Sequence, residues 1–211
     1  MAQRLGYLPP MPVTSTGEAD PIAAPLRHIE VRKTTQLQTI RIANDLAWER
    51  AKDAPIRALA VQIAGADLSQ ADVEIPIRVC RWIRANILYT QERPGVEILQ
   101  GPYTTLPART LQTPMGPVTF GGTGTGDCDD LSILFSALLT SLGVPAYVAG
   151  IGPTAAKGKS LVHAMGWCNG RFYELSIDDA YRGFGSKVEE TASPGIGCIA
   201  IIFDPMTSGF R

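Results

Sequence analysis

Apolar residues recur at the three- and four-residue spacing of amphipathic helices in several stretches of the chain. The first stretch, residues 36–65, is interrupted near Pro55 and ends at Gly65, so it predicts two consecutive helices. A second stretch predicts a helix over 72–88. Its stripe repeats every four residues, at Ile75, Val79, Ile83 and Ile87, and is widened by Trp82.

The clearest helical pattern follows Gly126-Asp127, where Asp127 is a suitable N-cap. Its apolar positions keep helical spacing through three turns, and Gly143 with Pro145 ends the pattern. These positions are Leu131, Leu134, Phe135, Leu138, Leu139 and Leu142.

Short apolar runs predict strands. They occupy residues 144–151, 161–168, 171–177 and 198–203, and residues 28–34 alternate as a further strand. Asn169-Gly170 lies between two of these runs and predicts a hairpin with a two-residue turn. In that register His163 pairs with Ser176, and Glu174 and Asp178 lie diagonally on the same face.

Helices followed by hairpin-connected strands indicate an α+β fold. Residues 1–30 contain five prolines before His28 and are predicted to form an extended N-terminal arm. Residues 31–211 then form one domain. Residues 93–126, rich in Gly, Pro and Thr, are expected to be a long irregular loop that lines or covers a cleft, with Gln100 as a site-lining residue.

Charge and composition narrow the classes of function. The chain has 19 Lys and Arg against 20 Asp and Glu, so it has no overall attraction to nucleic acid or anionic membranes. We see no signal peptide and no apolar run that spans a bilayer, so a cytoplasmic or virion-associated location is expected. Four widely separated cysteines then predict free thiols rather than a disulfide framework.

Cys128 is the first candidate for chemistry. It precedes Leu131 by three residues and therefore lies on the apolar stripe, in the first turn of the predicted helix. The helix dipole and free N–H groups there favour a thiolate, whereas Asp127, Asp129 and Asp130 oppose it. On the helix pattern alone, a buried inert thiol explains Cys128 equally well.

His163 is the second candidate, because the chain has only two histidines. On its own it reads as an ordinary strand histidine. The hairpin register, however, places Glu174, Ser176 and Asp178 on its face, where any of them can orient the imidazole.

The ordered set of these pieces resembles the transglutaminase-like superfamily, and more narrowly its bacterial and phage-associated members. The resemblance covers residues 75–177, about half the chain. Its most specific part is Gly126-Asp127-Cys128-Asp129-Asp130-Leu131 followed by Leu142-Gly143-Val144-Pro145-Ala146, and His163-Ala164 with the hairpin completes it. Residues 83–89 and 94–102 resemble the segments that precede this motif.

The resemblance implies a papain-like fold in which N-terminal helices and the catalytic helix pack on an antiparallel sheet. It also implies a nucleophilic Cys128, with His163 as general base and acid, that attacks a peptide or protein amide and forms an acyl-enzyme. Water or an amine then accepts the acyl group, as in a cysteine peptidase, an amidase or a transglutaminase. No cofactor and no metal is expected.

The third member of the site departs from the family pattern. The position of the family's aspartate falls on Ser176, so we predict Asp178 as the acid, with Ser176 and Glu174 as alternatives. A catalytically weak module that serves in phage structure or assembly, or binds another protein through the N-terminal arm, is the alternative function. A metal site from Cys128, Asp130 and His163 is a third hypothesis, although no pair has zinc-like spacing.

Overall fold

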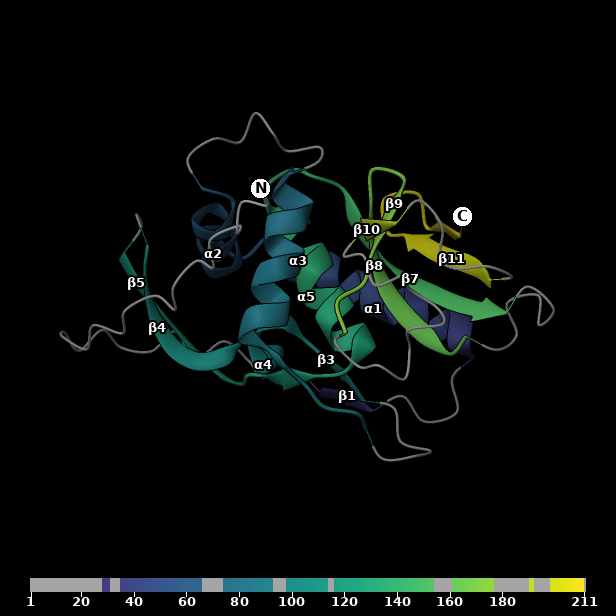
Figure 1. The fold of residues 1–211 in the computed structure, drawn as a ribbon, viewed down its shortest axis with the longest axis horizontal. Helices are drawn as coiled ribbons and strands as arrows, with labels where there is room; N and C mark the ends of the chain where they lie inside the picture. Colours follow the sequence, from purple (N-terminus) through teal and green to yellow (C-terminus); the bar gives the residue numbers. More distant parts are fainter. Residues whose placement is uncertain are drawn as a thin grey trace, which may run out of the picture.

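The computed structural model describes residues 28–30, 35–65, 74–92, 98–113, 116–153, 161–176, 190–191 and 198–210. They form a mixed α+β fold, as predicted. Figure 1 shows the β4–β5 hairpin at one side, the helices in the middle and the largest sheet at the other side. The elements in chain order are β1 (His28–Glu30), α1 (Gln36–Arg50), α2 (Ala54–Ala64), α3 (Glu74–Asn86), β2 (Leu88–Tyr89), β3 (Ile98–Gln100), α4 (Pro102–Thr105), β4 (Pro107–Thr113), β5 (Gly116–Thr123), β6 (Thr125–Gly126), α5 (Cys128–Ser141), β7 (Ala146–Pro153), β8 (His163–Cys168), β9 (Arg171–Tyr173), β10 (Glu190–Thr191), β11 (Cys198–Asp204) and β12 (Gly209–Phe210).

The first three helices form where the apolar spacing predicts them. The break between α1 and α2 lies at residues 51–53, and Pro55 is in the first turn of α2, where proline is compatible with a helix. Gly65 ends α2 with φ of +83°, a left-handed conformation that suits glycine. The stripe of α3 from Ile75 to Ile83 is fully buried.

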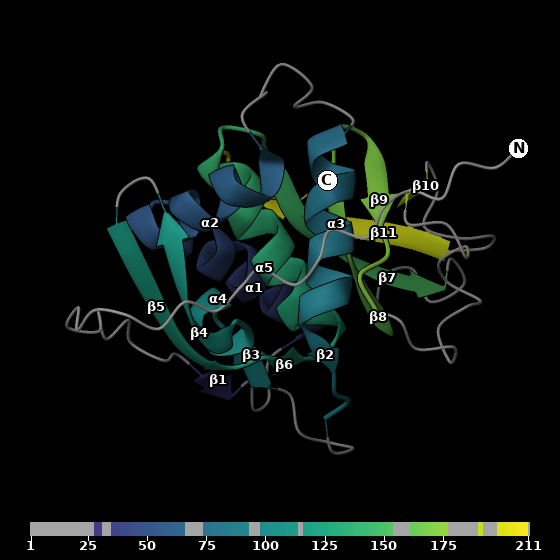
Figure 2. The same cartoon turned by 60° about the vertical axis from the view of Figure 1, so that its left-hand side comes forward.

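Helix α5 is the centre of the molecule. It contacts α1, α2, α3 and α4 as well as β7 and β8, and Figure 2 shows it enclosed by the other helices with the sheet behind. Its apolar residues from Leu131 to Leu139 are almost completely buried. A helix this enclosed is held mainly by tertiary packing, so its two ends have well-defined positions.

The largest sheet has six strands in the order β10-β9-β8-β7-β11-β12, and every neighbouring pair is antiparallel. The predicted turn joins β8 and β9, where Asn169 and Gly170 both have positive φ, as a two-residue hairpin turn requires. Two glycines on this sheet allow the helices to approach closely. A Cβ on Gly166 would lie 2.5 Å from Phe135 of α5, and a Cβ on Gly150 would lie 2.8 Å from Ile40 of α1.

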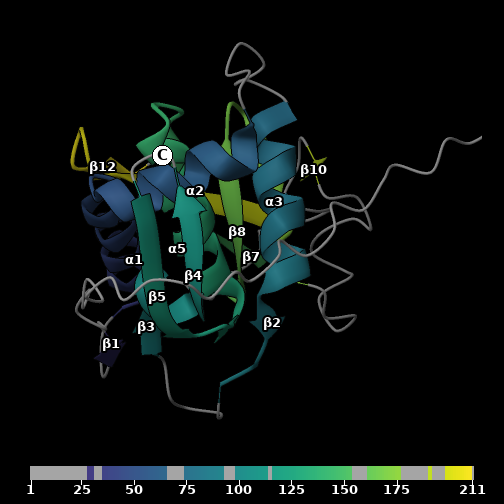
Figure 3. The same cartoon turned by 90° about the vertical axis from the view of Figure 1, so that its left-hand side faces the viewer.

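The expectation of an irregular loop over residues 93–126 is wrong. Most of its described residues form β3, α4, β4, β5 and β6, and Figure 3 shows β4 and β5 as a long antiparallel hairpin. Leu111, Val118 and Phe120 point into the core, while Thr110 and Thr119 pair across the exposed side. Thr104 and Thr105 lie in α4, and the other threonines of this stretch lie in β4, β5 and β6, where their β-propensity suits them.

The predicted N-terminal arm ends inside the fold. Its last three residues form β1, which pairs antiparallel with β3 in the register His28↔Gln100. Residues 1–27 lie outside the described part of the chain. Within the described residues, no helix is long and apolar enough to cross a membrane.

Candidate active site

Cys128 begins α5, and the strand before it fixes where the helix starts. Strand β6 pairs in parallel with β2, so Gly126 lies opposite Tyr89, and the N–H of Thr90 donates to the carbonyl of Gly126 over 2.9 Å. A Cβ on Gly126 would lie only 2.7 Å from Cβ of Asp130. The glycine that precedes the motif is therefore required by close packing beneath the helix.

Asp130 ties the first turn of α5 to β3. Its Oδ1 accepts the backbone N–H of Gln100 over 2.7 Å, and its Oδ2 accepts the Gln100 side-chain amide over 2.8 Å and the N–H of Asp127 over 3.3 Å. Asp130 is fully buried. Gln100, predicted to line the site, thus lies beside the helix start that carries Cys128.

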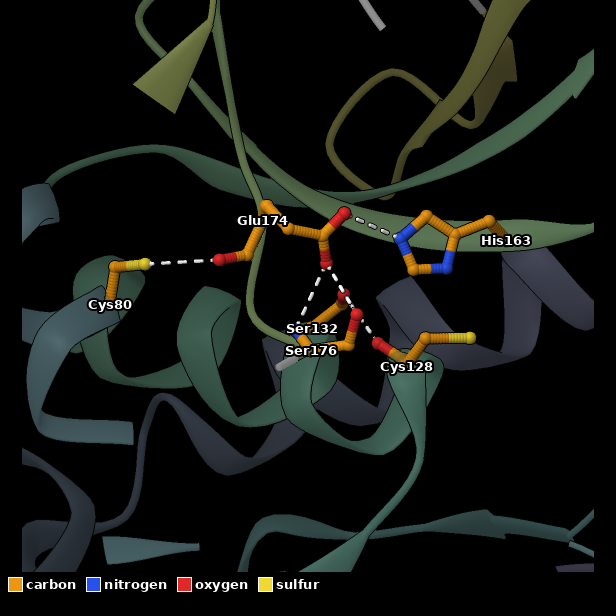
Figure 4. A network of polar contacts seen from close by, with 6 residues as sticks. All are labelled: Cys80, Cys128, Ser132, His163, Glu174 and Ser176. Atoms are coloured by element: carbon orange, nitrogen blue, oxygen red, sulfur yellow. Dashed lines mark hydrogen bonds and ion pairs between the residues drawn. The ribbon is translucent and has the colours of Figure 1, made fainter. Parts of the chain in front are cut away.

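His163 is the first residue of β8 and pairs with Ile151 of β7. Its side chain is buried, and Nε2 lies 2.9 Å from Oε2 of Glu174. Figure 4 shows the ring between Glu174 and Cys128, with Nδ1 on the edge that faces Cys128. The thiol at the start of α5 and the imidazole at the start of β8 therefore lie on the same side of this network, and their catalytic pairing stays a prediction.

Of the three candidate residues, Glu174 is the one that contacts His163. The β8–β9 ladder follows the predicted register through Gly166↔Tyr173 and then ends, so the predicted pair of His163 with Ser176 is not formed. Instead, the N–H and Oγ of Ser176 donate to Oε1 of Glu174 over 3.0 and 2.8 Å. Asp178 lies outside the described residues, so its role stays a prediction.

The electrostatics of Cys128 differ from the expectation for a helix N-terminus. Burial of the sulfur raises the pKa of the Cys128 thiol well above its usual value, and the carboxylates of Asp129, Asp127 and Glu174 raise it further. The N–H of Ala164 bonds the sulfur and opposes this rise only in part. The resting group is therefore a neutral thiol rather than the stabilised thiolate that the helix dipole suggested.

The two buried acids of the site behave in opposite ways. Burial alone would raise the pKa of Glu174, but the hydrogen bond and charge of His163 and the donors of Ser176 bring it below its usual value. Burial raises the pKa of Asp130 well above its usual value, with Asp127 adding to the rise. The pKa of Glu174 is thus lowered by its partners, whereas the pKa of Asp130 stays raised although Gln100 and Asp127 donate to it.

A metal site is not defined by these side chains. Ligand atoms of Asp127, Cys128 and Asp129 lie within 4.8 Å of one another, which is close enough to share a cation. The metal site suggested by the sequence used Cys128, Asp130 and His163. In the structure, however, the Asp130 oxygens bond Gln100 and Asp127, and His163 Nε2 bonds Glu174. Neighbouring carboxylates are common at helix N-termini, where they suit the dipole without any ion.

The expectation of free thiols is confirmed for Cys80, Cys128 and Cys168. Cys80 and Cys168 are buried and unbridged, and Cys128 is partly exposed and unbridged. Cys80 of α3 donates its thiol to the backbone carbonyl of Glu174 over 3.4 Å. Through this contact α3 joins the polar network around Glu174 that Figure 4 shows. The spacing of residues in the sequence did not indicate the contact.

Comparisons with known proteins add no family assignment. No protein-family model matches the chain, and neither a curated protein nor a solved structure matches it.

Proposed function

We propose that the protein catalyses cysteine-dependent acyl transfer from an amide, with Cys128 as nucleophile, His163 as general base and acid, and Glu174 as the residue that orients the imidazole. The observation that carries the proposal is the placement of His163 between Glu174, at 2.9 Å from Nε2, and Cys128, which faces Nδ1. This order of nucleophile, base and orienting acid is shared by unrelated families of acyl-transfer enzymes.

The arrangement of helix and sheet supports a papain-like, transglutaminase-type fold. In such a fold the nucleophile begins a buried helix and the histidine lies on an antiparallel sheet packed against it. Here α5 begins at Cys128 and contacts β8, which begins at His163. We therefore extend the resemblance of residues 75–177 to the fold as part of the same proposal.

The raised pKa of Cys128 means that the first step must include removal of the thiol proton. Because the resting thiol is neutral, the proton moves from Sγ to Nδ1 of His163 as the sulfur attacks the carbonyl carbon. The carbonyl π electrons move onto oxygen, and the resulting tetrahedral anion needs hydrogen-bond donors. The N–H of Cys128 is at the start of α5, where helix geometry provides no intrahelical acceptor, so it is available for this purpose.

Collapse of the tetrahedral intermediate breaks the C–N bond, and the imidazolium gives its proton to the leaving amine. The acyl group then remains on Sγ as a thioester. Water or an amine attacks the thioester, His163 removes the proton of the attacking group, and the thiol is regenerated. The carboxylate of Glu174 stabilises the imidazolium in both halves of the cycle.

Acyl capture tests the proposal without knowledge of the natural substrate. The full chain is incubated with p-nitrophenyl acetate, nitrophenolate release is followed, and intact-mass and fragmentation spectra locate the acetyl group. We expect one acetyl group on Cys128, none in Cys128→Ser, and acylation slowed by about 100-fold or more in His163→Gln. Cys168, a buried thiol of β8, is the internal control and should stay unmodified.

Amide chemistry is then tested with a set of glutamine-containing and C-terminally amidated peptides, with ammonia or amine release as the readout. Hydrolysis and transfer are distinguished by adding a primary amine and measuring the mass of the product, which contains the amine only if transfer occurs. A folded protein that acylates no faster than Cys128→Ser would reject the enzyme and favour the binding or phage-assembly module.

A further inference from the structure

Ser176 makes two contacts on one carboxylate oxygen. Both its N–H and its hydroxyl donate to Oε1 of Glu174, over 3.0 and 2.8 Å, while Oε2 faces His163. The two oxygens of Glu174 therefore have separate partners, and Figure 4 shows Ser176 on the side of the carboxylate away from the imidazole. Ser176 does not replace the acid of the site, as the sequence had allowed, but supports it.

Burial makes these two donors important. Ser176 is 4% exposed and Glu174 is 8% exposed, so bulk water does not solvate the carboxylate freely. A buried carboxylate without donors favours its protonated form, whose O–H can donate to Nε2 and so select the other tautomer of the imidazole. Ser176 and His163 together hold the pKa of Glu174 below its usual value despite burial.

The backbone around Glu174 is also fixed. Strand β9 ends at Tyr173, and the bond from Ser176 N–H to the Glu174 side chain closes a local turn just after it. The thiol of Cys80 holds the Glu174 carbonyl from the other side. The carboxylate thus has little freedom to rotate as long as Ser176 is in place.

The orientation of Glu174 determines the tautomer of His163. A neutral imidazole carries one proton, and a carboxylate beside Nε2 selects the form with Nε2–H. That form leaves the lone pair on Nδ1, the nitrogen that faces Cys128. The other tautomer would place a hydrogen toward the thiol and would be unable to accept its proton.

We propose that Ser176 is a positioning residue: its N–H and hydroxyl hold Glu174 as an oriented carboxylate, and Glu174 in turn keeps His163 in the Nε2–H tautomer that presents the Nδ1 lone pair to Cys128. The inference deepens the proposed function and rests on it for its catalytic meaning. The tautomer itself is a property of the folded protein and can be measured whether or not the protein turns over.

The test compares Ser176→Ala with a matched control in the full chain. Imidazole ¹⁵N shifts distinguish a protonated nitrogen from one that carries a lone pair, and His163→Gln assigns the signal because His28 is the other histidine. We expect the wild type to show the Nε2–H form, and Ser176→Ala to show a clear gain of the Nδ1–H form. Ser141→Ala removes a buried serine hydroxyl that bonds Leu138 within α5 and should leave the tautomer unchanged.

Kinetics of acetylation by p-nitrophenyl acetate supply the second readout. Ser176→Ala should lower kcat by about tenfold with little change in KM, since Ser176 is buried and both its donors are used by Glu174. Ser176→Thr, which keeps the hydroxyl, should restore both kcat and tautomer. If Ser176→Ala does not fold, Ser176→Cys gives the same comparison with a weaker donor.

Unchanged tautomers and unchanged kcat in Ser176→Ala would overturn the inference. Loss of kcat with an unchanged tautomer would also overturn it, because the effect would then be merely structural. A tautomer change in a protein that never acylates Cys128 would sustain the Ser176–Glu174–His163 coupling and reject the proposed function, so the two failures are distinguishable.

Discussion

Single residues of this site are controlled by burial more than by their position along the helix. Cys128 begins α5, yet burial and three neighbouring carboxylates raise its pKa well above the usual value. The same burial raises the pKa of Asp130, whereas His163 and Ser176 reverse its effect at Glu174. The direction of each pKa shift thus depends on the balance between burial, the donors to the carboxylate and the charges nearby, which are His163 beside Glu174 and Asp127 beside Asp130.

Removal of one carboxylate beside the nucleophile should increase its reactivity. Asp129→Asn keeps an Oδ1 acceptor for the N–H of Asp130 but removes a charge that raises the pKa of the thiol. We expect iodoacetamide to alkylate Cys128 about two- to tenfold faster at a given pH below the thiol pKa, since each unit of pKa is tenfold in thiolate. Asp45→Asn, an exposed aspartate on α1, is the control. Equal rates in the two variants would contradict the electrostatic account.

Glu174, the proposed orienting acid, should be needed for the proposed turnover but not for the fold. Glu174→Gln keeps the shape of the side chain, but its amide can donate to Nε2 and so select the wrong tautomer. We predict that acylation of Cys128 falls by roughly 10²- to 10⁴-fold, as in other triads that lose their acid. Burst kinetics with p-nitrophenyl acetate measure this, and circular dichroism checks the fold. A loss below threefold would instead point to another orienting group, such as Asp178.

At the scale of elements, the start of α5 is held by contacts that cross between segments far apart in the sequence. Asp130 joins α5 to Gln100 of β3, and Gly126 passes close beneath it. Gly166 similarly lets α5 approach β8 at Phe135. These contacts set the distance between the helix that carries the thiol and the strand that carries the imidazole.

Asp130 should make stability depend on pH in a defined direction. Its pKa in the folded protein lies well above the ordinary value of 3.8, so the folded state binds a proton that the unfolded chain has released. The free energy of unfolding should therefore fall as pH rises from 3.8 toward the folded pKa of Asp130. Urea unfolding at a series of pH values measures this slope, and Asp130→Asn should flatten it. An identical slope in the variant would mean that Asp130 is ionised in the folded protein.

Close approach of α5 to the sheet should make Gly166 intolerant of a side chain. Alanine there would place Cβ 2.5 Å from the ring of Phe135, so the helix or the strand must move. We predict a loss of about 1–3 kcal/mol in the free energy of unfolding, the usual range for overpacking. Gly121→Ala is the matched control, because no atom lies within 4 Å of its added Cβ. Chemical denaturation compares the two, and equal free energies of unfolding would show that the contact with Phe135 is relieved without cost.

At the scale of the whole molecule, the sequence correctly predicted the elements that have a clear local pattern of apolar residues or turn residues. Helix α5 follows its apolar stripe, and Asn169-Gly170 forms the predicted turn. The β4–β5 hairpin was missed because its exposed face, which includes Thr110, Gln112 and Pro117, gives no clear strand pattern, and no Asn-Gly lies between the strands. The β4–β5 strands are recognisable only once Leu111 and Phe120 are seen buried in the core.

Part of the candidate site could also be predicted, because two of its residues lie in elements with a clear local pattern. Cys128 and His163 have local signals, a helix start and a hairpin strand, and the structure brings them together. The choice among Glu174, Ser176 and Asp178 depended on the strand register beyond residue 173. Because β9 ends there, the period-two rule no longer decides which side chain faces His163.

The N-terminal boundary of the domain depends on contacts between segments that are far apart in the sequence. Residues 1–30 were predicted as an arm, but β1 pairs with β3, and β3 carries the Gln100 that bonds Asp130 at the start of α5. A chain that begins at residue 28 retains this strand partner, and one that begins at residue 31 loses it. We predict that the shorter chain is less stable by about 1–2 kcal/mol, the contribution of a few backbone hydrogen bonds. Urea unfolding of both chains and of the full protein measures the difference.

The shorter chain should also react with iodoacetamide at Cys128 at a changed rate, because loss of β1 weakens the position of β3, whose Gln100 bonds Asp130 at the start of α5. If both truncated chains match each other in stability and rate, β1 is dispensable and the domain begins after residue 30, where the sequence alone placed it.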